Sequence, residues 1–86
     1  MRELEKHLKA LANRRRLSIL KYLKGRREAP VAEIADEINL SFKSTSKHLV
    51  VLATLDIVER EQRSLQMFYS LASNQKPAIK HILLLL

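Results

Sequence analysis

The sequence contains no cysteine, no tryptophan, one glycine and two prolines. Without cysteine there can be no disulfide bond, no thiolate metal site and no thiol redox switch. The scarcity of glycine and proline argues against a loop-rich or disordered chain. Cysteine nucleophiles, glycine-rich phosphate loops and paired carboxylates are all missing as well, so we do not expect an enzyme.

Long apolar runs are also missing. The longest, Ile82 to Leu86, is about a quarter of the length that a membrane-spanning helix needs. Met1 leads directly into a charged amphipathic segment and not into the apolar core of a signal peptide. We therefore expect a cytoplasmic protein that makes no use of a membrane.

Acidic residues are few. The chain has 9 of them against 16 lysines and arginines, which gives a net charge of +7 at pH 7. Such an excess favours a polyanionic partner through counterion release and long-range attraction. An anionic membrane would require the cations to lie opposite an exposed apolar face of one helix, whereas the apolar positions here are needed for a core. At 86 residues the chain is expected to form a single domain over residues 1–86.

Apolar residues recur at intervals of three and four along most of the chain, which is typical of amphipathic helices. Asn13 and Ser41 can cap two of these helices, Gly25 can end one, and Pro30 suits a first turn. Asn39 is able to adopt the left-handed conformation that ends a helix. The helices are expected over residues 3–12, 14–24, 31–38, 42–55 and 78–86.

The short connection at residues 39–41, between two short helices, predicts a helix-turn-helix. Further on, the period changes from 3.6 to 2 over residues 57–61 and 66–71, which indicates two strands of a hairpin. The joining segment has neither glycine nor asparagine, so we expect a looser tip than a tight two-residue turn. The predicted fold is mostly α with a small β-hairpin, a winged helix-turn-helix.

The helix predicted over residues 42–55 carries the candidate functional surface. Thr45, Leu49 and Leu52 share one face, while the other side is cationic, rich in hydroxyls and free of acids. Lysines and hydroxyls suit DNA phosphates and base edges, and arginines on the hairpin suit the minor groove or phosphates. The candidate DNA-binding residues are Ser41, Phe42, Lys43, Ser44, Ser46, Lys47, His48, Arg60 and Arg63.

Several segments together resemble the ArsR family of winged-helix repressors. The segment ALANRRRLSIL at 10–20 is similar to the family's opening motif, and residues 31–35 with 40–52 are similar to its helix-turn-helix core. Residues 57–58 and 68–71 resemble the wing strands. The similarity extends from about residue 4 to residue 72 and covers most of the chain.

The resemblance implies a homodimer that binds an inverted repeat in operator DNA. It implies wing contacts near Arg63 and base contacts at Phe42, Lys43, Ser46, Lys47 and His48. Phe42 stands where the family commonly has a polar residue. The end segments 1–12 and 73–86 would form the dimer interface, and the apolar last helix needs such a cover. The implied interface residues are Leu4, Leu8, Ile79, Ile82, Leu83 and Leu86.

Many members of the ArsR family respond to metals, but the matching positions here do not carry the ligands. A cysteine pair is absent, and Ser73 and Gln75 occupy positions where the last helix would supply ligands. His7 and His81 could meet only across a dimer, and zinc wants three or four ligands. We expect no metal and no cofactor, and the effector is unknown.

Two functions remain as alternatives to a DNA-binding repressor: a winged-helix protein-interaction module and a nonspecific nucleic-acid-binding protein.

Overall fold

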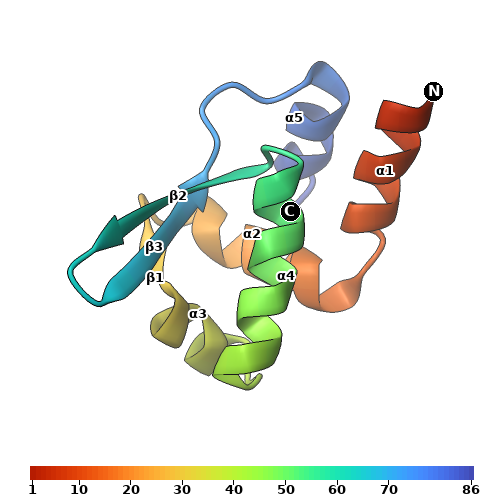
Figure 1. Cartoon of the computed structure of the whole chain (residues 1–86). Helices are drawn as coiled ribbons and strands as arrows, with labels where there is room; N and C mark the ends of the chain where they lie inside the picture. Colours follow the sequence, from red (N-terminus) through yellow and green to blue (C-terminus); the bar gives the residue numbers. More distant parts are fainter.

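The computed structural model describes all 86 residues and forms a winged helix-turn-helix, which confirms the predicted fold class (Figure 1). Five helices form the body of the domain, a small antiparallel sheet lies at its edge, and the hairpin that forms most of this sheet projects to one side as the wing. Along the chain the elements are α1 (Arg2–Leu11), α2 (Arg14–Lys24), β1 (Ala29–Pro30), α3 (Val31–Glu37), α4 (Phe42–Thr54), β2 (Val58–Arg63), β3 (Gln66–Leu71) and α5 (Pro77–Leu84).

The boundaries of the helix-turn-helix follow from the capping residues. The side chain of Asn13 accepts the N–H of Arg16 at 3.1 Å, which satisfies a free donor at the start of α2. Ser41 does the same for α4 by accepting the N–H of Ser44 at 3.1 Å. Between α3 and α4, Asn39 has a φ of 60° and reverses the chain as predicted. The turn therefore fixes how α4 leaves α3.

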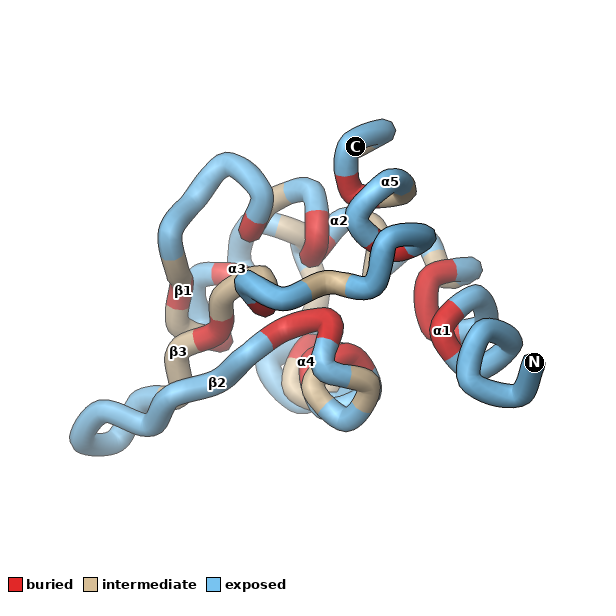
Figure 2. The backbone as a smooth tube through the Cα atoms, turned by 90° about the horizontal axis from the view of Figure 1, so that it is seen from above, coloured by how far each residue is buried: buried red, intermediate tan, exposed pale blue.

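The core is apolar and draws on nearly every element. α2 supplies three of its fully buried side chains and contacts α1, α3, α4, α5 and β3, so it lies at the centre of the domain. Figure 2 shows buried positions concentrated along the inner sides of the helices and at the root of the sheet. The largest fully buried apolar side chains are those of Ile19, Leu20, Leu23, Ile34, Leu49, Leu52, Ile57, Val58 and Ile79.

A third strand was not predicted. β1 pairs with β3, with Ala29 opposite Tyr69 and Pro30 opposite Phe68, so the sheet order is β1-β3-β2. The prediction of a loop at Ala29 is wrong, because Ala29 lies in this strand, whereas Pro30 stands at the start of α3 as its N-cap. Two residues are too few to show a period, and proline is tolerated in a strand only at an edge, where its missing N–H is not needed.

The wing tip is tighter than predicted. Arg63 pairs with Gln66, which leaves only Ser64 and Leu65 to connect the strands. Ser64 has a φ of 56°, a conformation that costs little for glycine but more for a residue with a side chain. The expectation of a looser tip is therefore wrong, because serine takes the left-handed conformation that the tight connection requires. Beyond Val58 all of β2 is exposed, whereas β3 is mostly partly buried, and the hairpin extends away from the body (Figure 2).

The ends of the chain lie on the side of the molecule away from the wing, where α1 and α5 are found (Figure 1). α5 begins at Pro77, which occupies the first turn where a missing N–H has no consequence. None of the five helices has the length and apolar character that crossing a bilayer requires.

Candidate nucleic-acid interface

α4 is attached to the core by one face and leaves its opposite face exposed. Thr45, Leu49 and Leu52 are 0% exposed, as predicted from their spacing. Near the N-terminus of the helix, Phe42 is 60% exposed, and Lys43 and Lys47 are also exposed. The buried face fixes the rotation of α4 about its own axis, so its cationic side must point away from the domain.

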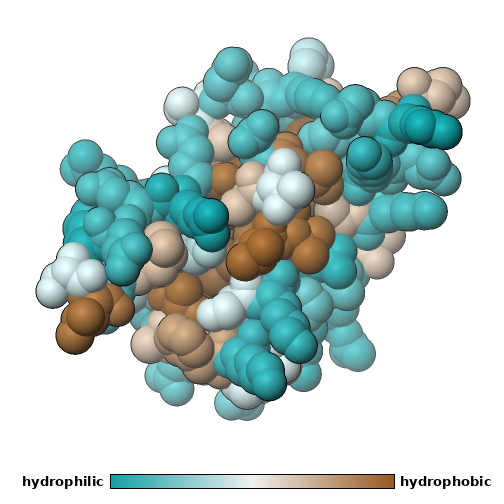
Figure 3. Space-filling model, in the orientation of Figure 1, coloured by the Kyte–Doolittle hydropathy of each residue, from teal (hydrophilic) through white to brown (hydrophobic).

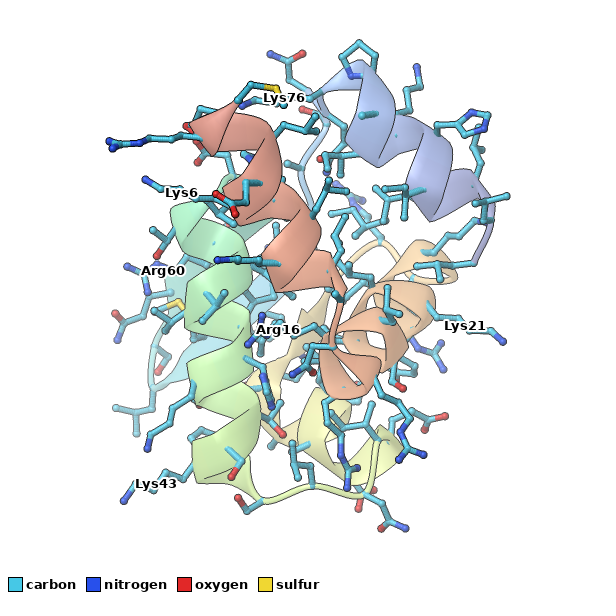
Figure 4. The ribbon with its side chains drawn as sticks, turned by 90° about the vertical axis from the view of Figure 1, so that its right-hand side faces the viewer. Lys6, Arg16, Lys21, Lys43, Arg60 and Lys76 are labelled. Atoms are coloured by element: carbon cyan, nitrogen blue, oxygen red, sulfur yellow. The ribbon has the colours of Figure 1, made fainter.

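The exposed side of α4 contains a shallow groove of about 460 Å³. Its lining brings together two ammonium groups, a hydroxyl and an aromatic ring, from Phe42, Lys43, Ser46, Lys47 and Val50. Ammonium groups attract phosphates, a hydroxyl can bond a phosphate or a base edge, and an apolar surface can contact a thymine methyl group. Figure 4 shows Lys43 extending into solvent at the N-terminal end of α4.

Three of the predicted DNA-binding residues on α4 are only partly exposed: Ser44, Ser46 and His48. His48 is held by α2, because the Nε of Arg16 donates to its Nδ1 at 3.2 Å. Burial and the neighbouring charges of Arg16 and Arg15 lower the pKa of His48, which favours the neutral ring that can accept this bond. His48 therefore presents its other ring nitrogen, Nε2, as the free hydrogen-bonding atom.

The arginines at the start of α2 connect this helix to its neighbours, a role that was not predicted from the sequence. The Nη1 of Arg15 donates to the carbonyl oxygen of Ile38 at 2.9 Å and so joins α2 to the end of α3. The Nη1 of Arg16 donates to the carbonyl oxygen of Ala10 at 3.0 Å, in addition to the bond with His48. These two arginines thus hold the helix-turn-helix together. Ile38 and His48 lie 23 and 32 positions away from their arginines, so no local signal could have revealed these two contacts.

The two wing arginines differ in their surroundings. Arg60 is exposed on β2 and forms no ion pair, which leaves its charge available. Arg63 pairs with Glu28, with Nη2 and Oε1 at 2.7 Å, and with Glu61 at 3.1 Å, and it lies over the ring of Phe68 at 4.6 Å. Hydrogen bonds to Arg63 lower the pKa values of both glutamates. Arg63 therefore carries its charge within a local cluster.

The residues expected at the dimer interface fall into two groups. Ile79 and Leu83 are 1% and 7% exposed, because α5 uses them to pack on its own domain. Ile82 and Leu86 are partly buried against the same core. The exposed large apolar side chains at this end of the molecule are instead Met1, Leu4, Leu8, Leu84 and Leu85. They leave an apolar surface on α1 and at the end of α5.

No group of three histidine, cysteine, aspartate or glutamate side chains is arranged to hold a metal ion. His7 is buried, with Nδ1 2.7 Å from the carbonyl oxygen of Glu3 and Nε2 3.2 Å from that of Leu55. His7 therefore joins α1 to the end of α4, and His48 is occupied by Arg16. His81 lies exposed on α5.

Comparison with known proteins agrees with this geometry. A family model described as a helix-turn-helix domain matches residues 11–61, which is more than half of the chain. The transcriptional activator HlyU of Vibrio cholerae is 36% identical over 76 residues, covering 88% of this chain and 69% of HlyU. The chain belongs to the ArsR family of winged-helix regulators. As a member of this family it is a DNA-binding transcription regulator, and its relatives are regulators and not enzymes.

Solved structures of ArsR-like regulators superimpose on most of the chain. HlyU from Vibrio cholerae has a TM-score of 0.82 at 31% identity, covering 96% of this chain and 86% of that one. A possible ArsR-family regulator from Mycobacterium bovis, a homodimeric winged helix-turn-helix DNA-binding domain, has a TM-score of 0.81 at 28% identity, with 96% and 73% covered. The repressor PagR of Bacillus anthracis gives 0.75 at 26% identity, with 95% and 93% covered.

Proposed function

We propose that this protein is a homodimeric repressor that binds an inverted-repeat operator. The proposal rests on the acid-free, cationic face of α4. Because the opposite face of α4 is buried in the core, Phe42, Lys43 and Lys47 point into solvent. A helix presented in this way enters the major groove with its N-terminal residues on the base edges. Ser41, Ser44, Ser46 and His48 would supply hydrogen bonds around the two lysines.

The wing extends the proposed interface beyond α4. Arg60 has an unpaired charge and reaches the phosphates or the minor groove next to the site that α4 reads. Arg63 takes part from within its cluster with Glu28 and Glu61, and a phosphate that approaches it must compete with these carboxylates. We therefore assign the larger share of the wing's DNA affinity to Arg60.

Two copies are proposed to join through α1 and α5. The supporting observation is the exposed apolar surface that includes Leu4, Leu8 and Leu84, which a second copy would cover. Ile79, Ile82, Leu83 and Leu86 would support this surface from within each protomer. A two-fold dimer presents two copies of α4 to the DNA, so its operator is expected to be two-fold symmetric.

We propose repression because PagR, 93% of which is covered by the match to this chain, is a repressor. HlyU, by contrast, is an activator. A bound dimer would exclude polymerase by occupying the promoter. The protein would act in the cytoplasm, where bacterial promoters are found. In vitro transcription from a promoter that contains the operator distinguishes the two directions, because added protein should lower the transcript yield and an activator would raise it.

The main experiment is a selection from random DNA duplexes at two salt concentrations. We expect a two-fold symmetric motif, bound with an affinity that falls steeply with salt, since each neutralised phosphate contributes about 0.9 to the slope. Lys43→Ala and Lys47→Ala should each weaken binding, with relaxed specificity for a base contact or a uniform loss for a phosphate contact. Lys21→Ala, on the exposed side of α2, is the matched control.

Binding without an enriched motif would indicate a nonspecific nucleic-acid-binding protein. Absence of binding at low salt would disprove the proposal and favour a protein-interaction module. The oligomeric state is measured separately by light scattering, where wild type should give a dimer and Leu4→Glu with Leu8→Glu a monomer.

A further inference from the structure

A second groove lies between α1 and the C-terminal half of α4. It has a volume of about 620 Å³. Lys6, Lys9 and Arg16 contribute three cations to its lining, and Val50, Val51 and Leu55 contribute aliphatic surface. No acidic residue lines it. The groove shares Val50 with the first groove on α4 but contains none of Phe42, Lys43 and Lys47.

The aliphatic part of this groove is open to solvent. Val50 and Val51 are 46% and 37% exposed, although both lie in the middle of a helix whose other face forms the core. The space-filling view shows a hydrophobic patch over the middle of α4, bordered by hydrophilic side chains (Figure 3). DNA phosphates would gain nothing from such a surface, because they need donors and not hydrocarbon.

Size and charge together define the occupant. A volume of about 620 Å³ falls within the range of about 300–1,000 Å³ that is typical of small-molecule sites. Three cations without an acid attract an anion, while the valines and Leu55 favour a hydrocarbon body. We propose that the groove binds a small anionic amphiphile, a carboxylate with an aliphatic chain.

Arg16 is placed to hold the carboxylate. Its Nη1 and Nε are fixed by the carbonyl oxygen of Ala10 and by His48, so the guanidinium is immobilised before any ligand arrives. Its remaining N–H groups can donate to an anion, and a guanidinium suits a carboxylate better than an ammonium does. Figure 4 shows Lys6 extending from α1 beside α4, and Arg16 lying between α4 and the junction of α1 and α2.

Occupation of the groove would act on the DNA-reading helix. The carboxylate, bound to the free N–H groups of Arg16, adds negative charge beside α4 and close to His48, which Arg16 also contacts. This charge lowers the affinity for a polyanion. The ligand would therefore release the protein from DNA. The binding site itself stands independently of the proposed operator, so binding can be tested without any DNA.

The test uses the full chain and the fluorescent anionic amphiphile 8-anilinonaphthalene-1-sulfonate. We expect saturable binding, displacement by octanoate, and much weaker displacement by 1-octanol, which lacks the charge. The double variant Lys6→Glu/Lys9→Glu should weaken octanoate binding by about fivefold or more, because two favourable charges become unfavourable. Lys21→Glu makes the same kind of charge reversal, at one lysine on the exposed side of α2, and should bind octanoate like wild type.

Amide chemical shifts then locate the ligand. Shifts at Val50, Val51 and Leu55, with a change in the ring signals of His48, would support the proposal. Shifts confined to Leu4, Leu8 and Leu84 would overturn it, because the probe would then occupy the exposed end surface. Equal octanoate binding by the Lys6/Lys9 and Lys21 variants would overturn it too, as would displacement of the dye by a short duplex or an acidic peptide but not by octanoate. Thermal melting confirms that each variant is folded.

Discussion

Thr45 provides the sharpest test of how α4 is anchored. Its side chain is 0% exposed, and its hydroxyl oxygen has no hydrogen-bond partner. A buried hydroxyl without a partner costs about 1–3 kcal/mol of stability, because it has lost water and gained nothing in exchange. Valine has nearly the same shape, the same branching at Cβ and a similar helix propensity. Thr45→Val should therefore remove this cost and leave the packing unchanged.

We expect Thr45→Val to raise the free energy of unfolding by about 1–2 kcal/mol, after allowance for partial relaxation of the wild type. For a domain of this size, each kcal/mol raises Tm by about 4–8 °C. The measurement is urea and thermal unfolding followed by circular dichroism, with all proteins at one concentration so that dimerisation contributes equally. DNA affinity should stay the same, because Thr45 lies on the side of α4 that faces the core.

The matched control is Thr54→Val in the same helix. Thr54 is exposed, and its hydroxyl donates to the carbonyl oxygen of Val50 at 2.8 Å, so the change should lie within about 0.5 kcal/mol of zero. An unchanged or lowered stability of Thr45→Val would refute the reasoning. It would mean that the hydroxyl of Thr45 has a partner, such as the carbonyl oxygen of Ser41 one turn earlier.

Three further predictions concern the connections between elements. Asn39→Ala should lower stability by about 1 kcal/mol in urea unfolding, because φ is 60° there, while Asn39→Gly should not. Gly25→Ala should raise stability by about 0.4–1 kcal/mol, since φ is −85° and the added Cβ meets only an ordinary contact at 3.8 Å; a loss would contradict this. Because Arg63 lowers the pKa of Glu28, the folded state gains stability above the ordinary value of 4.5 and loses it as the pH falls further. Glu28→Gln should therefore flatten stability between neutral pH and pH 3, and an unchanged profile would exclude this contribution.

The sequence predicted the elements whose causes are local. Asn13 and Ser41 act at helix starts by accepting an N–H three residues away, and Asn39 acts through its own φ, so the local sequence identified them. The buried face of α4 followed from the helical period, and the exposed face followed from it by exclusion. These features were enough to indicate the fold and the candidate DNA-reading helix.

Features that depend on distant partners were not predicted. β1 exists because Ala29 meets Tyr69 across the sheet, a pairing that two residues cannot reveal by their pattern. Arg63 and Glu28 are 35 positions apart, so their ion pair left no local signal. The prediction of a loose wing tip was wrong for a different reason. The usual residues for a tight turn are absent, and Ser64 adopts the strained left-handed conformation in their place.

The short strand β1 also has a consequence for solubility. An exposed sheet edge offers free N–H and C=O groups to any other strand and is a common starting point for aggregation. Here the edge strand β1, which covers Phe68 and Tyr69 of β3, is only two residues long and ends in Pro30, which has no N–H to offer. The other edge, β2, carries charges of both signs from Glu59 to Arg63. The wing can therefore extend far from the core without becoming a template on which neighbouring molecules assemble.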